Sequence, residues 1–357
     1  MGRRDLARLP DPISRVLQER GWLLADGATG TNLFNMGLVS GDAPEFWNEN
    51  HPDRIRALYQ GAVNVGVDLF LTNSFGSNAA RLRLHGAQTR ARELARISAE
   101  IAREVADRAG RNVIVAGSMG PTGELIEPLG QLSFSSAVEI LAEQADGLVA
   151  GGVDLIWVET MSALEELAAA REAIGATGVP WCATMSFDTA GRTMMGVTEA
   201  DLVTAVHGSD PLPLAAGANC GLGAPDLLRT VLGFVDAGMT CPIIAKANAG
   251  IPRFRHGKIR YDASVETMAN YAVLARDCGA SIIGGCCGTT ATHLDAMRVA
   301  LERTGRSERP GLEKITSQLG EFVGRLPDAP ADADQMKSER SIRRRKRKRH
   351  SGQSDVN

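Results

Sequence analysis

The amino-acid sequence predicts an α/β protein whose main domain is a (β/α)8 barrel of the TIM type. Short apolar runs rich in β-forming residues recur along the chain, and amphipathic helical segments lie between them. We count eight such runs. Eight strands that are each followed by a helix close into a barrel, which leaves no exposed sheet edge. An open, doubly wound parallel sheet is the alternative for this pattern.

The predicted strands span residues 22–25, 67–71, 113–116, 155–158, 181–185, 212–216, 243–245 and 281–283. A helix is clearest over residues 91–110, where apolar residues recur at spacings of three and four and Gly110 is placed to cap the end. The chain has 357 residues, and one barrel commonly needs roughly 250. We therefore expect a single barrel domain over residues 1–310.

A C-terminal extension, residues 311–357, follows the predicted barrel. From Leu326 onward it has no aromatic residues and few bulky apolar ones, so we expect the extension to be disordered. The basic run 343–349 would suit nucleic acid or another acidic surface. A solvated, solubilising tail is the favoured interpretation, because no aromatic side chains accompany the charges. We therefore do not expect a nucleic-acid partner.

Composition narrows the class of protein further. Apolar residues make up 44% and charged residues 23%, as in an ordinary globular protein, and a net charge of −3 does not indicate a polyanionic partner. No apolar run approaches the ~18 residues that span a bilayer, and the N-terminal stretch is too charged for a secretory signal. The six cysteines are too sparse for a disulfide scaffold. We expect a cytoplasmic protein with free thiols and no membrane contact.

Polar residues directly follow the predicted strands, at the end of the barrel where enzymes of this fold place their chemistry. They are Asp26, Asn73, Ser118, Glu159, Ser186, Asn219, Cys220, Asn248, Cys286 and Cys287. Cys220 follows the sixth strand, and Cys286 and Cys287 follow the eighth within "GGCCGTT". Closure of the barrel would bring these three sulfur atoms to one mouth.

Three neighbouring thiolates repel one another unless a cation neutralises them. Zn²⁺ accepts three cysteine ligands and keeps a fourth position for a ligand that exchanges, such as a substrate thiol, which it deprotonates. The glycines around Cys286 and Cys287 permit the close backbone that two adjacent ligands need. A phosphate-binding loop with incidental cysteines is the alternative, although residues 282–293 contain no lysine or arginine. We expect the other cysteines, Cys182, Cys241 and Cys278, to be structural.

Four motifs in this order resemble the homocysteine S-methyltransferase family over roughly residues 20–305. They are "DGATGTNL" at 26–33, "GANCG" at 217–221, "NAGIP" at 248–252 and "GGCCGTT" at 284–290. The resemblance implies a (β/α)8 barrel with a Cys₃ zinc site, in which a methyl group is transferred to homocysteine to give methionine. It also implies that Cys220, Cys286 and Cys287 are the zinc ligands. Family members often form homo-oligomers, so a homo-oligomer is possible here.

The resemblance assigns further residues to the amino-acid substrate. Glu159 matches a strand-end glutamate that contacts the homocysteine amino group, and Asp26 with Gly27 matches an element at the same substrate. Asn248 matches a residue near the amino-acid end of the substrate. Taken alone, Asp26 and Glu159 would serve equally as helix N-caps.

The methyl donor is expected to be small. Members that use methylfolate through a corrinoid carry additional domains, and the chain ends before any such domain. The segment "SGDAPEFWNENHPDRI" resembles bacterial proteins assigned as betaine-homocysteine S-methyltransferases, which implies glycine betaine as donor and dimethylglycine as product. S-methylmethionine or a separate methylcorrinoid protein are the alternative donors, and Asn73 and "NAGIP" resemble the corrinoid-linked branch.

Trp47 is the leading candidate for contact with a quaternary ammonium donor, because such cations bind on aromatic faces. Weaker candidates are Phe46, Phe75 and Phe187. Thr160 stands where animal-type betaine enzymes carry a tyrosine, and the aromatic content is only 4%. Trp47 as a packing residue is the alternative.

Overall fold

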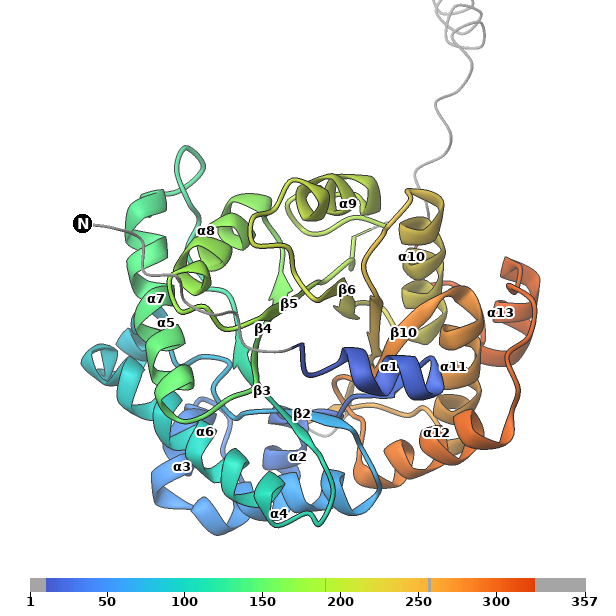
Figure 1. Ribbon diagram of the computed structural model, residues 1–357, viewed down its shortest axis with the longest axis horizontal. Coiled ribbons are helices and arrows are strands. Elements are labelled where there is room, and N and C mark those ends of the chain that lie inside the picture. Colours follow the sequence, from blue (N-terminus) through green and yellow to red (C-terminus); the bar gives the residue numbers. More distant parts are fainter. Residues whose placement is uncertain (1–10, 190, 256–257, 325–357) are drawn as a thin grey trace, which may run out of the picture. The chain divides into compact units, whose positions relative to one another are not determined.

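The computed structural model describes residues 11–189, 191–255 and 258–324 of the chain. Its main sheet has eight parallel strands in the order β1-β10-β7-β6-β5-β4-β3-β2 (Figure 1). A parallel bridge between Ala25 and Leu69 joins the two ends of this order and closes the barrel. The predicted (β/α)8 barrel is therefore confirmed. The strands are β1 (Leu23–Leu24), β2 (Leu69–Leu71), β3 (Ile114–Met119), β4 (Leu155–Met161), β5 (Trp181–Met185), β6 (Ala215–Cys220), β7 (Ile243–Ala247) and β10 (Ala280–Gly285).

Helices surround the barrel and bury their apolar stripes against it. In α6 (Ala91–Asp107), Leu94, Ile101 and Val105 are buried, as their spacing predicts. The helix ends three residues before Gly110, which adopts a left-handed conformation in the following turn. The other long helices are α4 (Pro52–Asn64), α7 (Phe134–Ala150), α8 (Leu164–Gly175), α9 (Glu199–His207), α10 (Ala224–Asp236), α11 (Val265–Cys278) and α12 (Ala291–Arg303). Shorter ones are α2 (Gly30–Asn35), η1 (Pro44–Phe46), α3 (Trp47–Asn50), α5 (Ala79–Leu82), η2 (Arg83–His85) and η3 (Gln88–Arg90).

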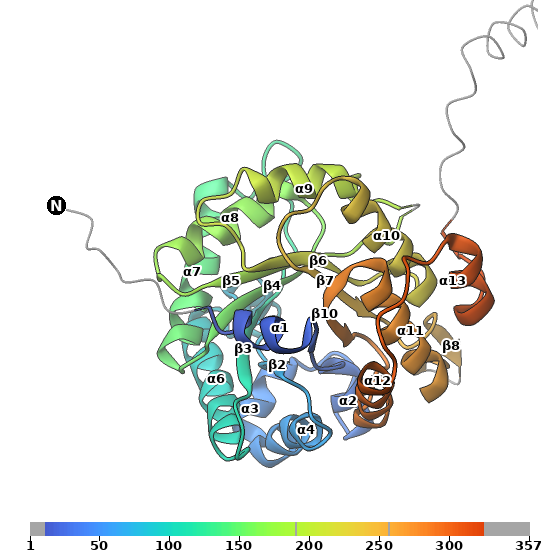
Figure 2. The ribbon, with the colours of Figure 1, turned by 45° about the vertical axis from the view of Figure 1, so that its right-hand side comes forward.

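A separate apolar cluster fills the inside of the barrel. Inward-facing residues such as Leu23, Leu69 and Ile114 pack together with Ile13, and Val16 and Leu17 of α1 (Ser14–Arg20) lie against them. Helix α1 therefore lies across one end of the barrel (Figure 2). Each strand runs parallel to its neighbours, so the residues that follow the strands meet at a common end.

Two features differ from the expectations drawn from the sequence. The antiparallel pair β8 (Arg253–Arg255) and β9 (Lys258–Arg260) was not predicted, because its strands are short and rich in charge. Within the extension expected to lack structure, residues 312–319 form helix α13 (Leu312–Leu319). Ile315 of α13 is fully buried, and Asp226 accepts hydrogen bonds from the backbone N–H groups of Val323 and Gly324. The compact unit thus continues past residue 310 to Gly324, and the basic run 343–349 lies outside the described residues.

Within the described part of the chain, no helix has the length and apolar character needed to cross a membrane.

Candidate functional site

Three cysteine sulfurs converge where β6 and β10 end. Cys220 is the last residue of β6, and Cys286 and Cys287 directly follow β10. The Cys220 Sγ lies 2.9 Å from the Cys286 Sγ and 3.8 Å from the Cys287 Sγ, and all three sulfurs lie within 4.8 Å of one another. The structure thus brings together the cysteines that the sequence singled out, although Cys220 and Cys286 are 66 positions apart in the chain.

The chemistry of this donor set fits a thiophilic metal ion. A tetrahedral ion with metal–sulfur bonds of about 2.3 Å places its sulfur ligands about 3.8 Å apart. The separation between Cys220 and Cys287 matches this value, whereas the 2.9 Å between Cys220 and Cys286 is shorter. The hydrogen bonds with Cys286 and Cys287, followed by burial, raise the pKa of the Cys220 thiol. Three thiolates therefore coexist here only when a cation neutralises them, and binding of that cation releases protons.

Asn248 joins the two loops that carry the cysteines. Its Nδ2 donates to the carbonyl of Gly221 over 2.9 Å, and its Oδ1 accepts from the backbone N–H of Cys287 over 3.0 Å. Both polar ends of the Asn248 side chain are thereby used on backbone groups next to the cysteines. The side chain is buried, and Asn248 is not among the residues that line the cavity described next.

A cavity of about 500 Å³ opens onto the cysteines, a size typical of sites for small molecules. Gly27, Ser118, Glu159 and Lys246 line it together with the three cysteines. Three aromatic residues, Phe34, Phe75 and Tyr261, contribute to its wall. Gly27 has no room for a side chain, because a Cβ there would lie 2.9 Å from the carbonyl oxygen of Thr289.

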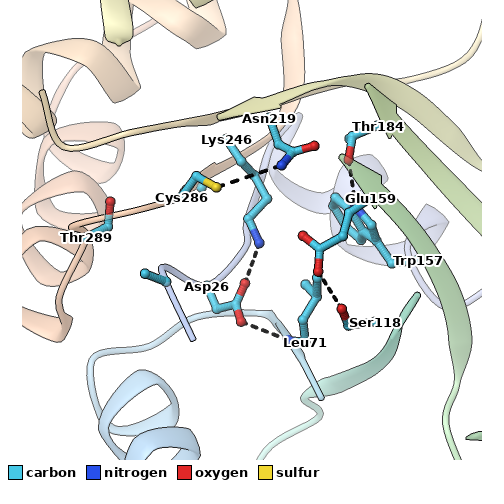
Figure 3. Close-up of polar contacts among 12 residues, drawn as sticks. Asp26, Leu71, Ser118, Trp157, Glu159, Thr184, Asn219, Lys246, Cys286 and Thr289 are labelled. Carbon is cyan, nitrogen blue, oxygen red and sulfur yellow. Dashed lines mark hydrogen bonds and ion pairs between the residues drawn. The ribbon is translucent and has the colours of Figure 1, made fainter. Parts of the chain in front are cut away.

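Glu159 stands in the cavity wall near the end of β4 and is held by Ser118, whose Oγ donates a hydrogen bond to its Oε1 (Figure 3). Loss of water around this carboxyl group raises its pKa to about 7, although the Lys246 ammonium and the Ser118 hydrogen bond oppose the shift. Glu159 thus offers a carboxylate to a cationic ligand group in neutral or alkaline solution.

Asp26 forms a buried ion pair with Lys246. The Lys246 Nζ lies 2.6 Å from the Asp26 Oδ1, and the Asp26 Oδ2 accepts from the backbone N–H of Leu71 over 2.9 Å (Figure 3). Asp26 is not among the residues lining the cavity, whereas its neighbour Gly27 is. Both side chains are buried.

A family model described as homocysteine S-methyltransferase matches residues 23–301. The methionine synthase of Mycobacterium tuberculosis is 32% identical over 314 residues, which cover 82% of this chain and 26% of the relative. The methionine synthase of Mycobacterium leprae is 29% identical, with 82% of this chain and 25% of that protein covered. This chain therefore spans about a quarter of the length of these relatives. The chain belongs to the homocysteine S-methyltransferase family.

A solved structure supports the fold of this family member. The metallated form of the homocysteine methyltransferase MmuM from Escherichia coli superposes with a TM-score of 0.68 at 23% identity, covering 81% of this chain and 99% of MmuM. The family resemblance drawn from the four motifs is thus confirmed, and so is the barrel that it implied.

In this homocysteine S-methyltransferase family member, Trp47 is packed inside the protein and does not line the cavity. Its ring is buried in α3, with the Arg54 guanidinium 4.9 Å from the ring centroid and the His51 ring 4.8 Å away. Trp47 is not among the cavity-lining residues. These contacts are typical of a packing residue, which is the alternative interpretation of Trp47. The contact of Trp47 with a methyl donor stays a prediction.

Lys246 is a cavity residue that we did not predict from the sequence, as are Tyr261 and Arg81. It lies in β7, inside the run "IIAKA", of which only residues 243–245 were assigned to the predicted strand. A lysine within such a run is itself a signal, because a charged side chain is seldom fully buried without a partner. The partner, Asp26, lies 220 positions away, and the sequence does not indicate the pairing.

Proposed function

We propose that this chain catalyses zinc-dependent methyl transfer from glycine betaine to the thiolate of homocysteine, giving methionine and dimethylglycine. The observation that carries the proposal is the convergence of Cys220, Cys286 and Cys287 in one cavity with Glu159. Membership in the homocysteine S-methyltransferase family supports the thiol substrate. The mycobacterial relatives are named for the synthesis of methionine, the product proposed here.

Cys220, Cys286 and Cys287 are the residues that would hold the zinc ion. A bound zinc ion supplies a Lewis acid that favours the thiolate form of a thiol beside it. Glu159 accepts the substrate ammonium, and the backbone of Gly27 passes close enough to border the same ligand. Asn248 orients the two cysteine loops through Gly221 and Cys287. A direct contact of Asn248 or Asp26 with the substrate stays a prediction.

The proposed reaction transfers one methyl group within the cavity that opens onto the cysteines. The homocysteine sulfur, having lost its proton, attacks one N-methyl carbon of betaine. A sulfur–carbon bond forms while the carbon–nitrogen bond breaks, and the electron pair of that bond stays on nitrogen. Tyr261 and Phe75 line the cavity and are the proposed aromatic contacts of the quaternary ammonium, although the Arg81 guanidinium already lies 5.6 Å from the Phe75 ring centroid. Burial raises the pKa of the Tyr261 phenol, and neighbouring Cys287 adds to the shift, so the ring is neutral.

A donor panel tests the proposal. Purified, zinc-loaded protein is given homocysteine with betaine, S-methylmethionine or a methylcorrinoid protein, and methionine is measured. We expect methionine and dimethylglycine in equal amounts from betaine. Methionine from another donor alone would show that the betaine assignment is wrong and leave the homocysteine site standing. The absence of homocysteine binding would overturn the whole proposal.

S-methylmethionine or a methylcorrinoid protein is the second candidate donor. The observation that favours these donors is that few aromatic side chains line the cavity near the cysteines. Among the described residues, Tyr261 is the aromatic lining residue that interacts with Cys287. Homocysteine is the small-molecule methyl acceptor in either case. A homo-oligomer stays a prediction.

A further inference from the structure

The buried ion pair between Lys246 and Asp26 places a positive charge in the wall of the cavity. Lys246 lines the cavity, and Asp26 does not. Figure 3 shows the Lys246 side chain extending into the space between Asp26 and Glu159. A ligand that enters beside the cysteines therefore meets the ammonium of Lys246 rather than the carboxylate of Asp26.

The Lys246 ammonium has unused hydrogen-bonding capacity. An ammonium group carries three N–H donors, and within the described part of the chain the Lys246 ammonium has one hydrogen-bond acceptor, the Asp26 Oδ1. The Trp157 ring centroid lies 5.4 Å from Nζ, which adds a favourable contact but no acceptor. The remaining donors are thus available to an anionic group in the cavity.

A purely structural role explains this pair poorly. A buried ion pair seldom stabilises a fold more than apolar residues of similar volume would. Burial opposes the charged form of Lys246, yet the carboxylates of Asp26 and Glu159 outweigh burial and hold the pKa of the lysine above its usual value. The charge is therefore maintained at the cavity wall, where it faces a ligand.

The position of Lys246 suits the thiol substrate. In the sheet, Lys246 pairs with Asn219 on β6 and with Gly284 on β10, so it lies directly beside the two strands that carry the cysteines. Homocysteine has only two methylene groups between its sulfur and its α-carbon. A sulfur placed at the cysteines thus keeps the substrate carboxylate within the same cavity, and Glu159 across from Lys246 takes the ammonium.

We propose that Lys246 is a specificity-determining residue that binds the carboxylate of the amino-acid thiol, and that Asp26 positions this lysine instead of contacting the substrate. The inference rests on the proposed function and specifies that Lys246 recognises the carboxylate of the substrate. Asp26 then acts by positioning Lys246. Lys246 binds the carboxylate of the zwitterionic substrate, and Glu159 binds its ammonium group.

The experiment compares binding of homocysteine with binding of 3-aminopropane-1-thiol, which lacks the carboxylate, by calorimetry on zinc-loaded protein without donor. The wild type should prefer homocysteine by about 10- to 100-fold, the range of a charged hydrogen bond. Lys246→Met should reduce this preference to about twofold. Asp26→Asn/Lys246→Met leaves no unpaired buried charge and should show the same loss, which guards against misfolding of the single variant.

Two further arms complete the test. Arg81→Met removes another cation that lines the cavity, and it should retain the preference. The KM for betaine in Lys246→Met distinguishes the donor carboxylate from that of the thiol substrate. Equal weakening of both thiols, loss of the preference in Arg81→Met, or an effect on betaine alone would each overturn the assignment of Lys246. Failure of the wild type to bind homocysteine would instead overturn the proposed function.

Discussion

Asn219 forms hydrogen bonds with Thr160 through both the oxygen and the nitrogen of its side-chain amide. The Asn219 Oδ1 accepts from the backbone N–H of Thr160 over 3.0 Å, and its Nδ2 donates to the Thr160 Oγ1 over 2.8 Å. Thr160 and Cys220 both have left-handed backbone angles, with φ of 63° and 61°, which cost energy for residues other than glycine. The amide therefore holds two strained strand ends, one next to Glu159 and the other at Cys220.

Asn219→Ala should loosen both strand ends. We expect zinc affinity to fall by about 10- to 100-fold, as for groups that orient metal ligands elsewhere, because Cys220 loses its fixed backbone. Competition with a chromogenic chelator measures the effect. Asn64→Ala, at an exposed position of α4, is the control and should bind zinc like the wild type. Unchanged affinity in Asn219→Ala would show that Cys220 is held by other contacts.

Cys286→Ala should remove the zinc site. Mass spectrometry of native protein should find about one zinc ion per wild-type chain and little in the variant, because two cysteine ligands do not retain the ion. Cys278→Ala, which changes a buried cysteine in α11, is the matched control. Equal zinc in wild type and Cys286→Ala would discard the metal site.

The pKa of Glu159, raised to about 7 by loss of water, predicts a pH dependence of ligand binding. A carboxyl with that pKa is about 10% ionised at pH 6 and about 90% ionised at pH 8. The affinity for methionine, whose thioether does not titrate, should therefore rise about tenfold over this range and be lost as pH falls. Glu159→Gln should abolish the dependence, whereas Glu199→Gln, at a raised-pKa carboxyl on α9, should retain it.

Tyr261→Leu should weaken donor binding and spare the thiol. Loss of one aromatic contact to a quaternary ammonium corresponds to about 0.5–2 kcal/mol, so the KM for betaine should rise between about twofold and thirtyfold. Homocysteine affinity, measured without donor, should change little. Trp47→Phe is the comparison, and we expect it to lower the melting temperature while leaving the KM for betaine unchanged. A raised KM for betaine in Trp47→Phe together with an unchanged KM in Tyr261→Leu would instead indicate that Trp47 contacts the donor.

Helix α13 should contribute to stability through a single side chain. Ile315→Ala removes a fully buried residue and should lower the free energy of unfolding by about 2–4 kcal/mol. Leu312→Ala, in the same helix but 45% exposed, should change it by less than about 0.5 kcal/mol. Equal small effects, measured by denaturant unfolding, would mean that α13 does not pack on the barrel in solution.

The barrel and its cysteine centre follow from local features of the sequence. A short apolar run predicts each strand. Because the strands are parallel, the residues just after these runs meet at one end of the closed barrel. Cys220, Cys286 and Cys287 were found in this way, and the structure brings their sulfurs together. Helix α13 was not predicted from the sequence, because its apolar face is narrow and Ile315 is its buried residue.

The sequence alone determined that Glu159 and the three cysteines stand at the mouth of the barrel, because strand ends are encoded locally. Only the tertiary structure decided how their charges pair. Lys246 and Asp26 come from β7 and from the end of β1, with β10 between those strands. Their attraction depends on both groups sharing a water-poor interior, and no spacing along the chain encodes that environment.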